Sequence, residues 1–358
     1  MIELENRTPF AAQLLAVPDA DGQEVSLLVV AATFATADDG ALVPAQPQPP
    51  VCLADEHFGD PASSSVRREA ETALPKPRVD LLVVGSAYAP RGRPTRSLVV
   101  ELRAAEIHKR VRVRGDRRRI MGRLAWPAKR FTRMPVVFER AWGGTDARSK
   151  DPRKHRALGT NPVGVGYRRA PSRDPAVRTQ LPNLEPIGGF RRRPVCLGVV
   201  PRAWQPRRDW AGSYDERWLA EQFPLPPKDF DPRHYQAAPA DQQSRRLRGG
   251  DEVILRNLTP DGVWRFPLPS LDVPVHLLFE DRAESSQARL DTVFIDAEAR
   301  QVTLVQRLAL PTVRNAPPLR RIVLGHVSAG WLRSRVRKKT FRDTTGRDGA
   351  LPHRAVYQ

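Results

Sequence analysis

The stretch EVSLLVVAATFA, which runs from Glu24 to Ala35, decides the fold class of this chain. It is almost entirely apolar, it contains several β-branched residues, and the turn-forming sequence DDGA follows it at Asp38. A run of this length and composition, closed by turn residues, predicts a buried β-strand. The run VDLLVVGSAYAP, from Val79 to Pro90, has the same character and ends in the turn sequence PRGRP.

The sequence IHKRVRVRG, which begins at Ile107, alternates between apolar and basic residues. Ile107, Val111 and Val113 fall on one face of an extended chain, whereas Arg110 and Arg112 fall on the other. This period of two is typical of a half-buried antiparallel strand, with its apolar face toward a core and its basic face toward water.

Strand-like runs return in the last third of the chain, as VILRNL, VWRFPL, VPVHLLFE, LDTVFIDA and QVTLVQRLA. The last two flank the sequence AEAR, from Ala297 to Arg300, and predict a hairpin. Beyond Pro311, eleven basic residues face only two aspartates, so we expect a basic tail with a short amphipathic helix near Gly330 to Thr340. We expect that deletion of residues 329–358 leaves the rest of the chain folded.

Regular periodicity fades between about residues 115 and 249, where short segments rich in Pro, Gly, Trp and Arg follow one another. Such segments indicate ordered loops, because a flexible linker would be rich in Ser and Gly and poor in large aromatic residues. Only Asp215 to Gln222 has a helical pattern, with Ser213 as the expected N-cap and Glu216 as its capping-box partner.

Together these patterns predict a mainly β protein made of two β-sandwich-like halves, with few short helices. The expected parts are an N-terminal half (1–125), an irregular Pro/Arg/Trp-rich segment (126–249), a C-terminal half (250–310) and the basic tail (311–358). The 35 prolines and 23 glycines among 358 residues also favour strands and ordered loops over helices.

The net charge of +19 raises the possibility of a nucleic-acid partner, whose phosphates reward clustered cations. Only eight of the 59 basic residues are lysines, a bias that a GC-rich genome explains more simply than a ligand does. The arginines are also dispersed, and the aromatic residues that a single-strand groove needs are not interleaved with them. Nucleic-acid binding therefore stays an alternative that the pattern disfavours.

The two cysteines, Cys52 and Cys196, lie far apart and have no neighbours with the spacing of a zinc site. The first ten residues lack the basic and then apolar pattern of a signal peptide, and no window is apolar enough for a membrane span. We expect a cytoplasmic protein without a metal, another cofactor or a membrane partner.

The stretch KDFDPRHYQAAPAD, from Lys228 to Asp241, is the strongest candidate for chemistry. Asp229, Asp231 and His234 have the side chains that a divalent metal or a pair of acid and base groups requires, so a metal-dependent hydrolase is one hypothesis. The alternative is structural: the carboxylates cap backbone NH groups in an irregular loop and pair with Arg233. The absence of a known metal-ligand spacing favours this alternative.

Aromatic residues of the middle segment stand beside Arg, Pro or Gly. The set consists of Trp142, Trp204, Trp210, Tyr214 and Trp218. Their neighbours favour loops that are held by packing between rings, prolines and guanidinium groups. A second hypothesis is that they are exposed anchors for a protein partner, since Trp, Tyr and Arg dominate binding hot spots.

Several segments resemble, in order, the domain-of-unknown-function family 2169 of bacteria. They include KPRVDLLVVGSAYAPRGRP, RMPVVFERAWGG, NPVG, LPNLE, PRRDWAGSYDERW, LPPKDFDPRHYQAAPADQ and RGGDEVILRNLTPDG, and the resemblance covers roughly residues 6–308. The family is encoded beside type VI secretion genes. The resemblance implies a non-enzymatic adaptor or chaperone that holds a type VI effector and helps to load it onto the VgrG spike or its PAAR tip.

No catalytic residues follow from the resemblance. It places Asp229, Asp231, Arg233 and Tyr235 in a family motif, which favours architecture or recognition over chemistry. The candidate partner-binding or motif residues are therefore Trp204, Arg207, Trp210, Tyr214, Asp229, Asp231, Arg233 and Tyr235. The basic tail lies outside the shared pattern.

Overall fold

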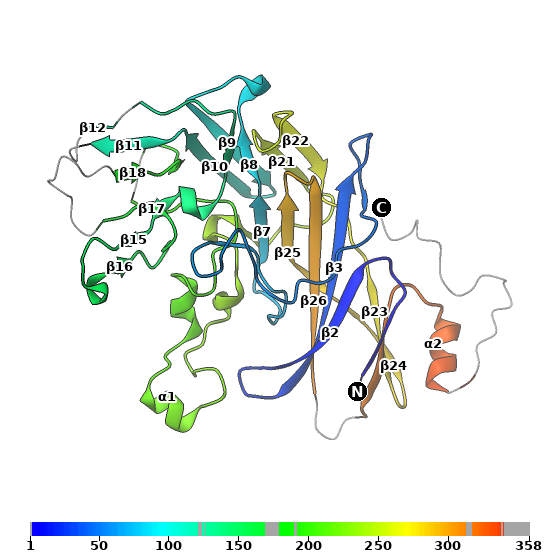
Figure 1. Ribbon diagram of the computed structural model, residues 1–358. Helices are drawn as coiled ribbons and strands as arrows, with labels where there is room; N and C mark the ends of the chain where they lie inside the picture. Colours follow the sequence, from blue (N-terminus) through cyan, green and yellow to red (C-terminus); the bar gives the residue numbers. More distant parts are fainter. Residues whose placement is uncertain are drawn as a thin grey trace.

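The computed structural model describes residues 2–120, 124–125, 127–168, 179–189, 192–312, 317–337 and 339. Three sheets of four or more strands form most of the ordered structure, and short two-stranded and three-stranded pieces accompany them (Figure 1). The α-helices among the described residues are α1 (Glu216–Glu221) and α2 (Ala329–Val336). The predicted mainly β class is confirmed.

The largest sheet is built around the stretch that decided the fold class, which forms β3 (Glu24–Thr36). Its strand order is β2 (Ala11–Pro18), β3, β26 (Gln301–Pro311), β25 (Arg289–Asp296), β7 (Val79–Val84) and β20 (Gln243–Ser244), with β4 (Leu42–Pro44) also paired to β3. Every residue of β3 from Val25 to Phe34 is buried. Alternate side chains enter two different apolar clusters, which explains why the run is continuously apolar.

The predicted hairpin at Ala297 to Arg300 is confirmed, because β25 and β26 pair in antiparallel fashion on either side of it. The other neighbour of β25 is β7, and that pairing is parallel. Parallel strands need a long connection, and the connection here is the whole middle of the chain.

A five-stranded sheet contains the alternating sequence. Its order is β19 (Leu184–Pro186), β10 (Ile107–Arg114), β9 (Ser97–Ala104), β21 (Glu252–Arg256) and β22 (Val263–Pro267). The alternation in β10 is confirmed, since Ile107, Val111 and Val113 are buried. Lys109 is buried on the same inward face, where its Nζ lies 2.7 Å from Oδ1 of Asp241.

The strands of the expected N-terminal and C-terminal halves share both of these sheets instead of forming two separate sandwiches. The reason is hydrogen bonding: β3 is buried on both faces, and its two edges pair with β2 from one half and β26 from the other. Likewise β9 lies between β10 and β21. Both sheets are therefore complete only when the last third of the chain is present.

The third large sheet corrects the expectation of a basic tail after Pro311. Its order is β1 (Glu3–Asn6), β27 (Leu319–Leu324), β23 (Pro274–Phe279) and β24 (Ala283–Gln287). The predicted amphipathic helix is α2, and its Trp331 is buried against Leu278 and Val323 of this sheet. Residues 317–337 are thus part of the fold because they carry apolar side chains among their arginines.

The middle segment is irregular, as expected, and the described part contains strands of two to four residues and short 3₁₀ helices. The strands are β11 (Arg117–Ile120), β12 (Leu124–Ala125), β13 (Arg133–Pro135), β14 (Trp142–Gly143), β15 (Thr145–Asp146), β16 (Arg156–Ala157), β17 (Val165–Gly166) and β18 (Thr179–Leu181). Earlier in the chain lie β5 (Glu56–His57), β6 (Val66–Arg68) and β8 (Ser86–Tyr88).

The motifs AWGG and NPVG meet around Asn161, which is completely buried. Its Nδ2 donates to the carbonyl oxygens of Phe138 at 2.9 Å and Trp142 at 3.1 Å. A Cβ atom on Gly143 would lie 2.2 Å from the backbone oxygen of Asn161, so the two backbones approach only because Gly143 has no side chain. Gly143 therefore allows the two motifs to pack closely against each other.

Candidate partner-binding surface

Residues 199–244 are fixed to the large sheet by Asp80 of β7, a carboxylate with no exposed surface. Its oxygens accept hydrogen bonds from Nε2 of Gln236 at 2.6 Å and from the backbone N of Ala237 at 2.7 Å. Nζ of Lys76 donates to the same carboxylate at 2.7 Å. A buried carboxylate with this many donors holds a loop in one position, since any shift would leave the charge unpaired.

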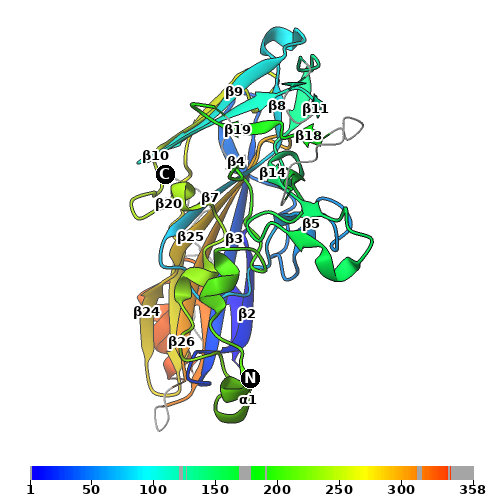
Figure 2. The ribbon, with the colours of Figure 1, turned by 90° about the vertical axis from the view of Figure 1, so that its left-hand side faces the viewer.

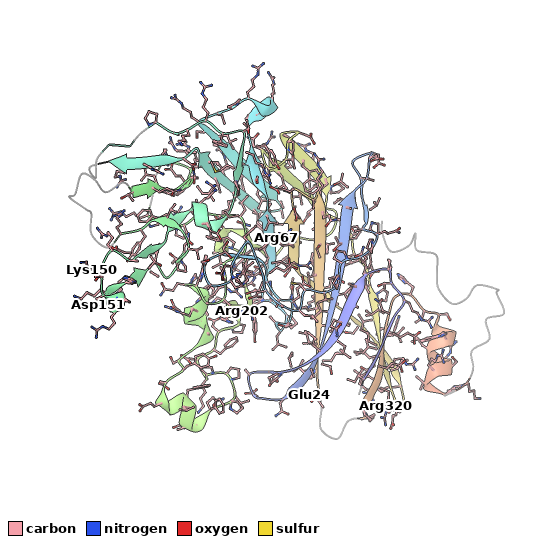
Figure 3. All side chains as sticks on the ribbon, viewed as in Figure 1. Glu24, Arg67, Lys150, Asp151, Arg202 and Arg320 are labelled. Carbon is pink, nitrogen blue, oxygen red and sulfur yellow. The ribbon has the colours of Figure 1, made fainter. Side chains whose placement is uncertain are left out.

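Arg207 is a second anchor, and only 3% of it is exposed. Its guanidinium donates to Glu69 Oε1 at 2.8 Å, to Val200 O at 2.7 Å and to His234 O at 2.8 Å. Burial alone would raise the pKa of Glu69, but the charge and hydrogen bonds of Arg207 outweigh it, and the pKa lies below its ordinary value. Arg202, which Figure 3 labels, also lies 3.2 Å from Glu69.

Trp204 and Arg207 were predicted as partner-binding candidates, and the structure places both inside. Trp204 is 7% exposed and packs edge-on against Phe138, with ring centroids 5.3 Å apart. Neither side chain can touch another protein without unfolding of the loop. They hold residues 199–244 in place, which is the loop-packing role that the sequence pattern favoured.

The acidic stretch divides into separate local contacts. Asp231 caps the 3₁₀ helix Pro232–Tyr235: one oxygen accepts the backbone NH of Arg233 at 2.8 Å and the other accepts its guanidinium. The Arg233 guanidinium also lies 4.9 Å from the ring centre of Trp210. Hydrogen bonds from Arg233 lower the pKa of Asp231, as a capping carboxylate requires.

Asp229 has other partners, since it accepts hydrogen bonds from the backbone N of Ser213 at 3.0 Å and from its hydroxyl at 2.8 Å. These hydrogen bonds lower the pKa of Asp229. Nδ1 of His234 lies 2.9 Å from the carbonyl oxygen of Arg207, and burial lowers the pKa of the His234 imidazole. The contacts match the capping interpretation of the acidic stretch. Within the described ranges no three His, Cys, Asp or Glu side chains are grouped to hold a metal ion.

Tyr235 completes this motif as a half-buried ring. It lies 5.3 Å from Phe230 and 6.2 Å from His234, measured between ring centres. Burial raises the pKa of its hydroxyl, so the ring stays neutral at ordinary pH. The stretch DFDPRHY is thus a compact structural unit held by ring contacts and by the Asp231 cap.

The exposed candidate residues lie around α1. Its N-cap is Asp215, whose Oδ1 accepts the backbone NH of Trp218 at 2.8 Å. This corrects the prediction that Ser213 caps the helix: Ser213 is bound to Asp229 instead. The helix begins and ends within one residue of the predicted stretch, so its position was predicted correctly and its cap was not.

Three large apolar side chains around α1 are more exposed than any others among the described residues. Tyr214 is 59% exposed, Leu219 is 61% and Phe223 is 63%. With Trp218 they form what we call the α1 apolar cluster (Tyr214, Trp218, Leu219 and Phe223). The Trp218 ring centre lies 4.7 Å from that of Tyr214 and 5.6 Å from that of Phe223, both in edge-on geometry.

Sequence reasoning named Tyr214 and Trp218 but missed Leu219 and Phe223. A signal was present, because a helix of only six residues with apolar side chains on more than one side cannot bury all of them.

The cluster lies at the end of a projecting loop, far from the five-stranded sheet in both views (Figures 1 and 2). Nε1 of Trp218 donates to the carbonyl oxygen of Leu225 at 2.9 Å. Leu225 in turn packs on the turn between β2 and β3, where a Cβ on Gly22 would lie 2.5 Å from its Cδ2. The cluster is therefore supported from below while its outer side chains face solvent.

A cavity of about 340 Å³ opens at the carboxyl ends of β7 and β25. Its charged side chains pair with one another: Arg67 contacts Asp296, and Nη2 of Arg133 donates to Glu298 at 2.6 Å. Ser86 lines the cavity as well, and its hydroxyl donates to Glu298 at 2.5 Å, so the polar side chains of the cavity are bound to one another. Neither described helix is long and apolar enough to cross a membrane.

Comparison with known proteins gives one match. Searches of curated proteins and of solved structures found no significant similarity. A family model matches residues 21–307, which is most of the chain and includes the anchors, the acidic motif and α1. The chain belongs to the family of uncharacterized proteins conserved in bacteria, DUF2169.

Proposed function

We propose that this protein is a cytoplasmic, non-enzymatic adaptor that binds a type VI secretion effector and helps to load it onto the VgrG spike or its PAAR tip. The type VI secretion context of this proposal rests on membership of the DUF2169 family. The observation that carries the proposal is the α1 apolar cluster, because its large side chains are exposed together on a projecting loop.

Contiguous exposed apolar residues on a folded protein mark surfaces that another molecule covers. Aromatic side chains are enriched at the centres of such interfaces, and Tyr and Trp contribute most among them, because they bury a large area with few rotatable bonds. Trp218 contacts both Tyr214 and Phe223 in the free protein, so these rings lose little side-chain freedom on binding.

The anchors explain how the loop can present this cluster. Asp80 and Arg207 hold the base of the segment by buried hydrogen bonds, and Leu225 holds the underside of α1. A preorganised surface binds with a smaller entropy loss than a disordered loop does. We therefore assign the family motif a supporting role and the α1 apolar cluster the contact role.

The hydrolase alternative has no comparable support. Both oxygens of Asp229 accept hydrogen bonds from Ser213, and both oxygens of Asp231 accept them from Arg233. The His234 ring is bound to a backbone carbonyl. A metal would have to displace these donors one by one. The hydrogen-bond geometry gives no reason to expect a metal in place of these donors.

The test is affinity purification of tagged protein from its native cytoplasm, together with secretion in a deletion strain. We expect one effector to co-purify and its secretion to stop, while the apparatus still exports other cargo. The double variant Leu219→Ser/Phe223→Ser should reduce recovery of the effector by about tenfold or more. Its matched control is Val43→Ser/Leu53→Ser, which removes two apolar residues that are 44% and 51% exposed elsewhere.

Equal recovery by the two variants would remove the α1 apolar cluster from the proposal. The adaptor function itself would be contradicted if the wild-type protein recovers no effector and secretion is unchanged in the deletion strain. Thermal melts of both variants show that any loss is not unfolding.

A further inference from the structure

The outward face of the five-stranded sheet carries six arginines, which we call the arginine face: Arg103, Arg110, Arg112, Arg114, Arg256 and Arg265. The opposite face of the same strands is buried in the main core. The side chains of Arg103, Arg256 and Arg265 are 51%, 47% and 58% exposed, so water covers this face in the free protein.

Strand register places these arginines beside one another. Arg110 lies opposite Glu101, which lies opposite Arg256 on the next strand. In the neighbouring row, Arg103 lies opposite Ile254, which lies opposite Arg265. Adjacent strands are about 4.8 Å apart, so the charges form a grid on a rigid support.

The carboxylates on this face do not balance the arginines. Glu101 is shared by Arg103, by His108 at 3.0 Å and by Arg256 at 3.6 Å. Glu252 contacts Arg265 at 3.4 Å, and the buried Glu185 contacts Arg114 at 2.8 Å. Six arginines thus face three carboxylates.

Arg110 and Arg112 form no ion pair with any residue that the structure describes. They lie on adjacent outward positions of one strand, where the register sets Arg110 opposite Glu101 and Arg112 opposite Glu185, two carboxylates that form their ion pairs with other cations. Guanidinium groups bind carboxylates in a planar, two-pronged geometry, which makes such a pair suited to an acidic side chain from another molecule.

A protein partner fits this face better than a nucleic acid does. None of the outward residues on these five strands is Phe, Tyr or Trp, and the outward ring they do carry, the imidazole of His108, is bound to Glu101 at 3.0 Å, so the face lacks the row of aromatic rings on which successive bases stack. Glu101 and Glu252 would repel phosphates, whereas they can accept hydrogen bonds from the polar groups of a protein. Val263, which is 44% exposed, adds apolar contact between the charges.

We infer that the arginine face is a second docking surface, which binds a carboxylate-rich surface of a protein partner. The inference does not rest on the proposed function, because the arginine face is separate from the α1 apolar cluster and differs from it in chemistry. The two surfaces lie at opposite ends of the molecule in both views (Figures 1 and 2). One chain can therefore hold an apolar partner and an acidic partner at the same time.

The test measures binding of the full-length protein to poly-L-glutamate, with oligothymidylate as the competing polyanion. We expect salt-sensitive binding of poly-L-glutamate, and a loss of about tenfold or more in Arg110→Glu/Arg112→Glu. The matched control is Arg153→Glu/Arg208→Glu, which changes net charge equally at side chains that are 91% and 60% exposed. That control should lose less than about twofold.

Equal losses in the two charge-reversal variants would overturn the inference, because binding would then follow total charge. Tighter binding of oligothymidylate, lost in the same Arg110/Arg112 variant, would also overturn it in favour of nucleic acid. Leu219→Ser/Phe223→Ser should bind poly-L-glutamate normally, which separates a failure of this inference from a failure of the adaptor proposal.

Discussion

At the scale of single residues, Arg207 was a candidate for partner binding in the sequence, and it holds the fold instead. Arg207 and Glu69 are both buried and meet at 2.8 Å. The Lys76 side chain is likewise buried beside Asp80, and the buried Lys109 reaches the exposed carboxylate of Asp241. In a chain with 51 arginines and eight lysines, such pairs join loops to sheets where apolar residues are too few. A buried ion pair is costly to break from one side, because the remaining charge stays in a dry environment.

We predict that Arg207→Ala lowers the free energy of unfolding by about 3 kcal/mol at neutral pH, because Glu69 loses its buried partner and keeps an ion pair with Arg202, whose side chain is 43% exposed. Arg208→Ala is the control; its side chain is 60% exposed, and the change should stay within about 0.5 kcal/mol. Urea unfolding of the three proteins measures both. An Arg207→Ala protein as stable as the control would show that the pair anchors nothing.

The same pair predicts a pH dependence. The pKa of Glu69 is lower in the fold than its ordinary value of 4.5, because Arg207 outweighs the effect of burial. The stabilisation is therefore complete above pH 4.5 and is lost as the pH falls through the lower, folded pKa. The difference between wild type and Arg207→Ala should shrink below pH 4.5. A difference that grows on acidification would contradict the assignment.

At the scale of elements, the two α-helices differ in how they meet the rest of the protein. Helix α1 has no buried residue and exposes its apolar side chains, which is the arrangement of a contact surface. Helix α2 buries Trp331 on the third sheet, and the Arg7 and Arg335 guanidinium groups lie 4.2 and 4.9 Å from its ring centre. The segment after Pro311 is thus held by apolar and cation–π contacts.

We predict that Trp331→Ala lowers the free energy of unfolding by about 3 kcal/mol, since it removes a buried ring and leaves a cavity. Arg333→Ala, at an exposed position of the same helix, should change it by less than about 0.5 kcal/mol. A chain truncated after Ser328 should melt at a lower temperature than the full-length protein. Identical melting curves would show that α2 does not stabilise the sheet.

At the scale of the whole molecule, the sheets join distant parts of the chain. The strand pair β3 and β26 joins residues near 30 to residues near 305, and β9 and β21 join residues near 100 to residues near 255. Contacts between residues so far apart in sequence give no stability until most of the chain is in place. The predicted division into separate halves therefore describes the sequence pattern and not the folding unit.

We predict that the part of the chain held by these sheets unfolds in one cooperative transition, because neither set of strands has a complete sheet alone. Circular dichroism and tryptophan fluorescence should give coincident denaturation curves. The fragment 1–125 should be unfolded by itself, since β3 would lack β26 and β9 would lack β21. A folded fragment with native-like strand content would contradict this.

The sequence by itself determined the local structure of this protein. The apolar run at Glu24, the hairpin at Ala297, the alternation from Ile107 and the position of α1 all follow from periodicity and turn residues, which act over a few neighbouring positions. The cap formed by Asp231 could also be read from the sequence, because it contacts Arg233 only two residues away, whereas Asp229 binds Ser213 sixteen residues away.

Only the tertiary structure decided which strands pair and which side chains are exposed. The pairing of β7 with β25 in parallel, and the burial of Arg207 by Glu69, depend on residues separated by more than one hundred positions. A local sequence pattern does not indicate which distant residues will become partners. For the same reason Leu219 and Phe223 looked like ordinary apolar residues until the fold left them uncovered. Arg110 and Arg112 looked like ordinary arginines of an exposed strand face, because the pairing of the nearby Glu101 and Glu185 with other cations depends on the folded structure.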